Sequence, residues 1–301
     1  MTQYERSGIV IAICGFAILS VGDAVVKSMA DEWPSFAVAA LRFSIGALVL
    51  SLILWRYEGG GGFVPQNLPL QIARGACVAL ASVCFFAAIY IMPLAEAMAI
   101  SFLAPIFTQI FAGLLIGEEI KPKVYGLSLF ALVGVAIILR PNLAELGWAA
   151  FLPLISAIFF ALLMVGNRAS AGQGSGLSMQ FFVAGFCAPI LLVFSFAAKL
   201  SGIAALDYDW PSLSVVARCI FVAFTASIAH WFAYIGISRA GAAMAAPAIY
   251  VQLIVAVTLG WIFFEEKPDV WTFVGAALII MAGVLIWRDD MKHQPDTAEM
   301  S

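Results

Sequence analysis

Charged residues are scarce in this chain: Asp, Glu, Lys and Arg make up 11% of its 301 residues, against about a quarter in an average soluble domain. Apolar residues make up 63%, and the mean hydropathy is +1.03. Such a chain would aggregate in water, whereas lipid accepts apolar side chains on the outside of helices. The composition therefore excludes an ordinary soluble domain, and without a basic cluster it gives no indication of a nucleic-acid partner.

Reactive side chains are also few, with two histidines and five cysteines. The cysteines lie within apolar stretches without metal-ligand spacing, so we expect neither disulfides nor a metal site. No nucleotide-binding motif appears, and no cofactor is expected. An intramembrane lipid-modifying enzyme would need a nucleophile, a metal cluster or clustered acids and bases. Non-enzymatic transport is therefore favoured, with such an enzyme and a non-transporting scaffold or receptor as the other classes.

Long apolar runs dominate the rest of the sequence. A run of roughly 18 to 24 apolar residues crosses a hydrocarbon core of about 30 Å as a helix. Short breaks, such as the one expected at Arg140–Asn142, make consecutive helices antiparallel neighbours. The predicted fold class is an all-α integral membrane protein with ten transmembrane helices. They are expected at 8–29, 34–55, 70–91, 94–116, 123–140, 147–168, 178–200, 213–236, 242–264 and 270–287.

The two halves of the chain repeat each other. Phe-Phe-Ala at 85–87 and Ala-Met-Ala at 97–99 recur as Trp-Phe-Ala at 231–233 and Ala-Met-Ala at 243–245, at a constant offset of 146 residues. Because each half holds an odd number of spans, the second must enter the membrane from the opposite side. The sequence thus predicts two inverted five-helix repeats, which can exchange shapes and expose a midplane site to each side in turn.

We expect the first repeat over 1–140, the second over 147–288, and a disordered cytoplasmic tail over 289–301. Nine lysines and arginines fall on the inner loops and helix ends against five on the outer ones when the N-terminus is inside. This bias favours cytoplasmic termini in a bacterial inner membrane. A monomer already contains both halves, so a dimer is possible but not required.

Several motifs resemble the EamA family of the drug/metabolite transporter superfamily. They are the stretch Ala-Met-Ala-Ile-Ser-Phe-Leu-Ala-Pro at 97–105, the Gly-Glu-Glu exit at 117–119, and their counterparts at 246–250 and 264–266. The resemblance implies a central cavity lined by both halves, with the last helix of each half peripheral. It also implies a small-molecule cargo, which in this family includes amino acids, nucleoside-like metabolites, vitamins, amines and drugs.

Three charged residues inside predicted spans are candidate substrate ligands, since intramembrane charge is costly. Asp23 and Lys27 are spaced i, i+4, which allows an ion pair on one helix face. The pair could bind a zwitterionic head group, or Lys27 could instead snorkel to the interface. Arg42 lies two turns inside the second span. It could hold a substrate carboxylate through its planar fork, act as an internal counter-ion for Asp23, or clamp the packing.

Gln109 and Gln252 are mid-membrane amides of the fourth and ninth spans. The repeat offset points them in matching directions, so they are candidate cavity residues or interhelical hydrogen bonds. Tyr250 and Trp231 are further candidates, Trp231 for stacking on an aromatic or cationic substrate.

Proton coupling has three candidates: Asp23, Glu96 and His230. His230 could titrate during transport or be a hydrogen-bonded core histidine. Glu96 could instead complement the helix dipole at the start of the fourth span. Pro105 and Pro247 fall within spans, where a missing N–H makes a kink or hinge.

The acidic ends of the fourth and ninth spans, at 118–119 and 265–266, are interpreted as interfacial gates or anchors. The sequence therefore favours a transporter of a small polar, amino-acid-like metabolite that works by alternating access. A riboflavin- or S-adenosylmethionine-type carrier is the alternative.

Overall fold

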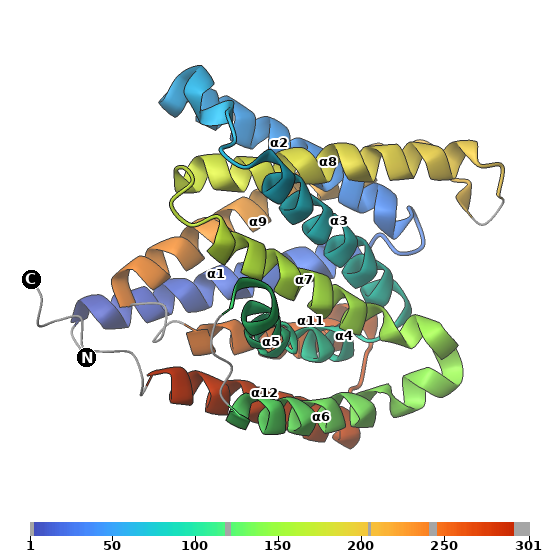
Figure 1. Cartoon of the computed structure of the whole chain (residues 1–301). Coiled ribbons are helices and arrows are strands. Elements are labelled where there is room, and N and C mark those ends of the chain that lie inside the picture. The colour runs from blue at the N-terminus through green and yellow to red at the C-terminus, as the bar shows by residue number, and fades with distance from the viewer. Residues whose placement is uncertain (1–2, 118–121, 204–205, 241–245, 292–301) are drawn as a thin grey trace, which may run out of the picture.

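The protein is a bundle of long apolar helices (Figure 1). The computed structural model describes residues 3–117, 122–203, 206–240 and 246–291. In these ranges nine helical segments are long and apolar enough to cross a membrane, and a shorter apolar one covers Ala248–Phe264. The chain is therefore an all-α, multi-pass membrane protein, as predicted. The helices are α1 (Gln3–Lys27), α2 (Ser35–Glu58), α3 (Leu68–Ile91), α4 (Leu94–Ser101), α5 (Ala104–Ile116), α6 (Pro122–Leu146), α7 (Leu152–Ala169), α8 (Gly176–Leu200), α9 (Leu213–Ala240), α11 (Val251–Phe264) and α12 (Val270–Met291), with 3₁₀ turns η1 (Gly59–Phe63), η2 (Gly147–Phe151) and η4 (Ala246–Tyr250).

The start of α1 and the end of α12 lie at the same end of the bundle (Figure 1), as an even number of crossings requires. We call the membrane side where α1 starts the N side and the opposite side the far side.

The fourth and ninth spans are interrupted. The fourth consists of α4 and α5, joined by a turn at Phe102 and Leu103, and Pro105 lies in the first turn of α5. Proline fits there because the first helical N–H groups have no partner within the helix. The described part of the ninth comprises the 3₁₀ turn η4, which contains Pro247, followed by α11. Pro105 thus lies just after a turn within its span and Pro247 within a 3₁₀ turn, and whether either acts as a hinge stays a prediction.

Two predicted helix ends are displaced. The expected break at Arg140–Asn142 does not end the fifth helix: the span ends at Arg140, but α6 continues to Leu146. Pro141 removes one backbone donor but does not turn the chain. The turn comes at Gly147, whose φ of +59° is strained for other residues. Likewise α12 continues to Met291 into the predicted tail, and the remainder, 292–301, lies outside the described residues.

The two halves interlock through their helices. In the contacts between halves, α1 packs on α9, α3 on α7, α2 on α8 and α6 on α12. In chain order, α1, α2, α3 and α6 of the first half correspond to α7, α8, α9 and α12 of the second. The α1–α9 contact therefore corresponds to the α7–α3 contact, and the α2–α8 and α6–α12 contacts each correspond to themselves. Figure 1 shows α2 crossing α8 at one edge and α6 beside α12 at the opposite edge.

Glycines allow some of these helices to touch through their backbones. A Cβ added to Gly134 of α6 would lie 2.6 Å from the Gly275 carbonyl oxygen of α12, and one added to Gly275 would lie 2.5 Å from the Gly134 oxygen. On α9, a Cβ at Gly236 would lie 2.7 Å from the Gly8 oxygen of α1. Small residues of this kind bring transmembrane helices into close contact.

Candidate functional site

Two opposite charges are brought together inside the bundle. Asp23 lies in the last turns of α1 and Arg42 in the third turn of α2. Both side chains are partly buried, and the charge of each acts on the other. Within the described ranges, neither makes a hydrogen bond or a close ion pair. The pair therefore keeps hydrogen-bonding capacity that a ligand could use.

Aromatic rings hold Arg42 from the side. Its guanidinium carbon lies 5.0 Å from the ring centroid of Phe43 and 5.3 Å from that of Phe86 on α3. Cation–π contacts of this kind fix the plane of the guanidinium. Because the rings also exclude water, they strengthen the electrostatic attraction between Arg42 and any anion that approaches it.

His230 of α9 is a third polar group within reach of the Arg42 charge. Its Nδ1 lies 2.6 Å from the carbonyl oxygen of Ala226. Since a carbonyl oxygen only accepts, Nδ1 carries the proton and Nε2 is left to face a ligand or water. Arg42 also acts electrostatically on Cys187 of α8 and Cys219 of α9. The helix that carries Arg42, α2, packs on α3 of its own half and on α8 and α9 of the other.

Lys27 has a different partner from the one its spacing allows. Its ammonium donates to the carbonyl oxygens of Ile89 at 2.7 Å and Met92 at 2.6 Å, and pairs with Glu266 at 2.6 Å. The other carboxylate oxygen of Glu266 accepts from the backbone N–H of Leu94 at 2.8 Å. We call this cluster the Lys27–Glu266 latch. It joins α1, the α3–α4 corner and the end of α11 on the far side.

Glu96 is buried at the start of α4, and its Oε1 lies 3.1 Å from the hydroxyl of Thr272 on α12. It thus contacts the last helix of the chain. The N–H of Leu94, at the start of the same helix, is satisfied by Glu266.

The remaining candidates lie on other elements. Gln252 is buried on α11, and its backbone carbonyl accepts from Ser20, 3.1 Å away and one turn before Asp23. Gln109 is partly buried on α5. The Tyr250 ring meets Phe102 edge-on at 5.3 Å. Trp231 is 64% exposed. The gate candidates at 118–119 lie outside the described residues.

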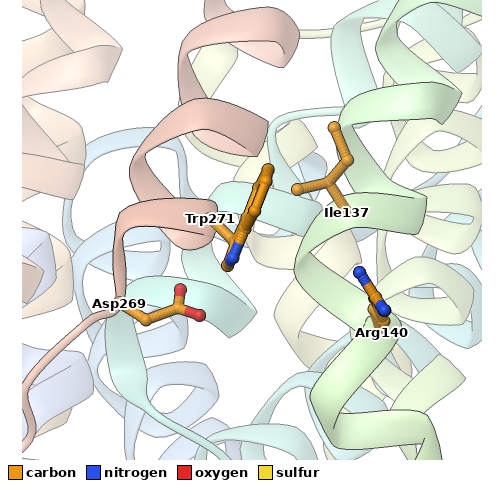
Figure 2. A pocket seen from close by; sticks show the side chains of 4 residues that line it. All are labelled: Ile137, Arg140, Asp269 and Trp271. Atoms are coloured by element: carbon orange, nitrogen blue, oxygen red, sulfur yellow. The ribbon is translucent and has the colours of Figure 1, made fainter.

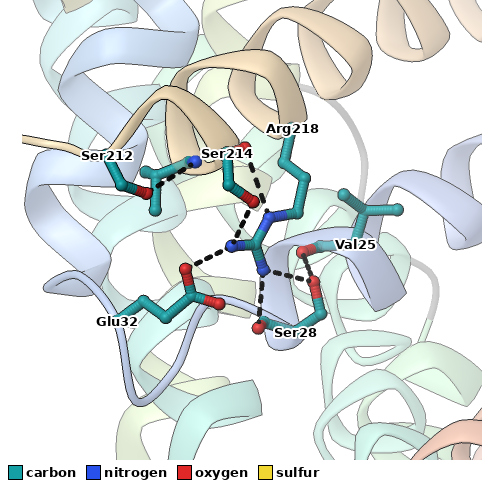
Figure 3. Close-up of polar contacts among 7 residues, drawn as sticks. Val25, Ser28, Glu32, Ser212, Ser214 and Arg218 are labelled. Atoms are coloured by element: carbon teal, nitrogen blue, oxygen red, sulfur yellow. Dashed lines mark hydrogen bonds and ion pairs between the residues drawn. The ribbon is translucent and has the colours of Figure 1, made fainter.

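Two arginines that the sequence places only by their charge lie near the starts of the third and eighth spans of the bundle, α3 and α9. Arg74 near the start of α3 donates to Asn167 of α7 through Nε at 2.9 Å and Nη2 at 2.7 Å. Arg218 near the start of α9 donates to the carbonyl oxygen of Ser28, after α1, at 2.9 Å and pairs with Glu32 (Figure 3). Arg74 thus latches the N side and Arg218 the far side. The repeat offset of 146 carries Arg74 to position 220, two residues from Arg218. This near match is the signal that could have identified them.

Comparison with known proteins agrees with this architecture. A model of the EamA-like transporter family matches residues 6–140 and 147–288. The pseudopaline exporter of Pseudomonas aeruginosa is 27% identical over 290 residues, covering 94% of this chain and 96% of its own. The S-adenosylmethionine uptake transporter of Rickettsia prowazekii is 26% identical, covering 95% of this chain and 96% of its own. The riboflavin transporter of Rhizobium johnstonii is also 26% identical, with 95% and 91% covered.

A solved crystal structure aligns with a TM-score of 0.61 at 20% sequence identity, over 94% of this chain and 98% of the other. At that identity the likeness shows the fold alone.

Proposed function

Because the chain belongs to the EamA-like transporter family, we propose that it carries a small zwitterionic, amino-acid-like metabolite across the bacterial inner membrane by alternating access. Transport of a small metabolite follows from the family and from the relatives, all named as metabolite transporters. One observation supports the cargo class: Asp23 and Arg42 are opposite charges on neighbouring intramembrane helices, both partly buried and, among the described residues, without a hydrogen bond or close ion pair.

The chemistry of this pair suits a molecule with both charges. Arg42 presents a planar fork that matches a carboxylate, and Asp23 can accept from a substrate ammonium. Charges inside a membrane are costly and are retained where they serve a pathway or a partner. A zwitterion satisfies both groups at once and enters without net charge. Nε2 of His230 can accept from a third polar group of the cargo.

Alternating access is supported by the arginine latches. Arg74 ties α3 to α7 on the N side, and Arg218 ties the α1–α2 connection to α9 on the far side. Since the helix contacts are unchanged when the halves are exchanged, opening one side amounts to releasing its latch while the other stays closed. We propose that the halves are inverted repeats over 1–140 and 147–288, with both termini in the cytoplasm.

A second cargo class, riboflavin- or S-adenosylmethionine-like, is favoured by the names of two relatives. Such molecules would use the aromatic rings of Phe43 and Phe86 beside Arg42 as well as its charge. Competition between amino-acid-like and flavin- or adenosyl-type compounds for the same site separates the two classes.

The test is a thermal-shift screen of metabolites on the purified protein, followed by flux of the hits into proteoliposomes. Asp23→Asn and Arg42→Gln should lower affinity and flux about tenfold or more, because each removes a charged hydrogen-bond partner. Gln109 and Gln252 variants test the two candidate amides of the fourth and ninth spans. Arg56→Gln, an exposed arginine at the end of α2, is the matched control. Normal flux in both charge variants would rule out this site, and binding without flux would rule out transport.

A further inference from the structure

A cavity lined by both charged and apolar side chains lies between α6 and α12, the pair of helices at one edge of the bundle. Its volume is about 470 Å³, and Ile137, Arg140, Asp269 and Trp271 line it. Figure 2 shows Arg140 on α6 and Asp269 before α12 on opposite sides of the space, with the Trp271 ring between them. Both helix ends belong to the far side, so the cavity opens at the membrane surface.

The two charges of this cavity are available to a ligand. Arg140 is exposed and, in the part of the chain that the structure describes, makes no hydrogen bond or ion pair. Oδ1 of Asp269 accepts from the backbone N–H of Thr272 at 2.7 Å and thereby caps α12. The second carboxylate oxygen, Oδ2, makes no hydrogen bond within the described ranges. The cavity therefore offers a cation and an anion on facing walls.

The helix surfaces next to the cavity are apolar and exposed, as lipid-facing surfaces are. Just inside the bilayer from Arg140 and Trp271, apolar side chains of α6 and α12 are 40–52% exposed: Leu132, Val133, Phe273 and Val274. Trp271 itself is 58% exposed, and tryptophan at this depth is typical of the headgroup region. A ligand that fills the cavity can thus extend acyl chains along the same two helices.

We propose that this cavity binds the headgroup of a phospholipid with a primary ammonium, of the phosphatidylethanolamine type. Its phosphate pairs with Arg140, its ammonium donates to Asp269, and Trp271 packs against the glycerol region. Phosphatidylcholine has no N–H to donate to Asp269, and phosphatidylglycerol has no cation. The headgroup therefore distinguishes this site from a nonspecific lipid contact. The proposal is independent of the cargo.

The experiment measures lipid binding to the purified full-length protein by native mass spectrometry and thermal shift. Dioleoyl phosphatidylethanolamine should bind at least about tenfold more tightly than the choline or glycerol lipid, because each charged hydrogen bond contributes about a factor of ten. Arg140→Gln should weaken the binding of all three lipids, because each carries a phosphate, and Asp269→Asn should remove the preference for phosphatidylethanolamine. Asparagine still caps α12, so loss of folding is not expected to obscure the second result.

Lys267→Gln is the matched control, an exposed cation on the same connection but outside the cavity lining. It should bind phosphatidylethanolamine as the wild type does. Equal binding of the three lipids by the wild type, an unchanged preference in Asp269→Asn, or undiminished lipid binding by Arg140→Gln would overturn the proposal. Equally tight binding of soluble phosphoethanolamine would also overturn it, since the site would then take a free phosphorylated amine.

Discussion

Individual polar side chains in this bundle differ in whether a partner satisfies them. The Tyr90 hydroxyl on α3 is buried and, among the described residues, has no hydrogen-bond partner. The Ser156 hydroxyl on α7 is also buried but donates to the Ala81 carbonyl at 2.8 Å. A buried polar group without a partner costs stability, whereas a bonded one contributes.

Tyr90→Phe should therefore leave the thermal unfolding temperature unchanged or raise it. Ser156→Ala, its matched comparison, should lose about 0.6–1 kcal/mol, the typical value of an interhelical hydrogen bond in a membrane. Thermal unfolding of both variants in one detergent tests this. An equal loss in the two variants would mean that Tyr90 has a partner, such as a ligand or water.

At this scale the sequence identifies which residues are costly but not how they pair. Asp23 and Arg42 stand out as charges within apolar runs, and their mutual electrostatic interaction is one of the alternatives expected for Arg42. The partner of Lys27 could not be predicted, because Glu266 is far along the chain and local spacing favours Asp23 equally well. Whether these groups bind cargo stays a prediction.

Among the connections between helices, the Lys27–Glu266 latch is an ion pair that is nearly buried on both sides. The two side chains are 11% and 12% exposed. Lys27→Met or Glu266→Gln alone leaves the other side chain as a buried charge or polar group without its opposite charge. Each should lower the free energy of unfolding by about 3 kcal/mol or more. The double variant should lose less than the sum of the two, with a coupling of at least about 1 kcal/mol. A double-mutant cycle of unfolding free energies measures it, with Lys267→Gln as control. Strict additivity would show that the contact contributes nothing.

The Arg218 latch carries a pH dependence. The Arg218 guanidinium bonded to Glu32 lowers the pKa of that carboxyl below its ordinary value of 4.5. Its stabilisation is therefore complete above the ordinary pKa and is lost as pH falls through the lowered one. The difference in unfolding temperature between wild type and Glu32→Gln should be constant from about pH 8 to pH 6 and vanish in stronger acid. A difference that already shrinks between pH 8 and 6 would contradict this origin.

Helix boundaries depend on where proline and glycine lie in the backbone, which the hydropathy of a segment reports only in part. Pro105 marks the break of the fourth span because it fits only the first turn of α5. Pro141 predicts a break that does not occur, because the chain turns at Gly147 instead.

For the molecule as a whole, the interlocked halves make each half dependent on the other. Since α1 packs on α9 and α3 on α7, either half alone would expose the faces that the other covers. A chain divided between α6 and α7 should accumulate as a folded, transporting protein only when both pieces are expressed together. Membrane yield and flux measure this, with the undivided chain as reference. A single piece that folds and transports would contradict it.

The number of spans and the correspondence between halves can be derived from hydropathy and the repeated motifs. The packing of α1 along α9 cannot be, because many pairings of apolar helices are equally hydrophobic. Backbone contacts such as Gly236 on Gly8 decide among them, and they become visible only in three dimensions.

The bonds around Lys27 also bear on how deeply the α3–α4 corner can sit. Its ammonium has three protons, and Ile89, Met92 and Glu266 accept all of them. Two carbonyl oxygens of this corner are therefore hydrogen-bonded without water, and the corner can lie within the hydrocarbon region. In bilayers of greater thickness, the protein can accommodate hydrophobic mismatch at this point without unwinding either helix.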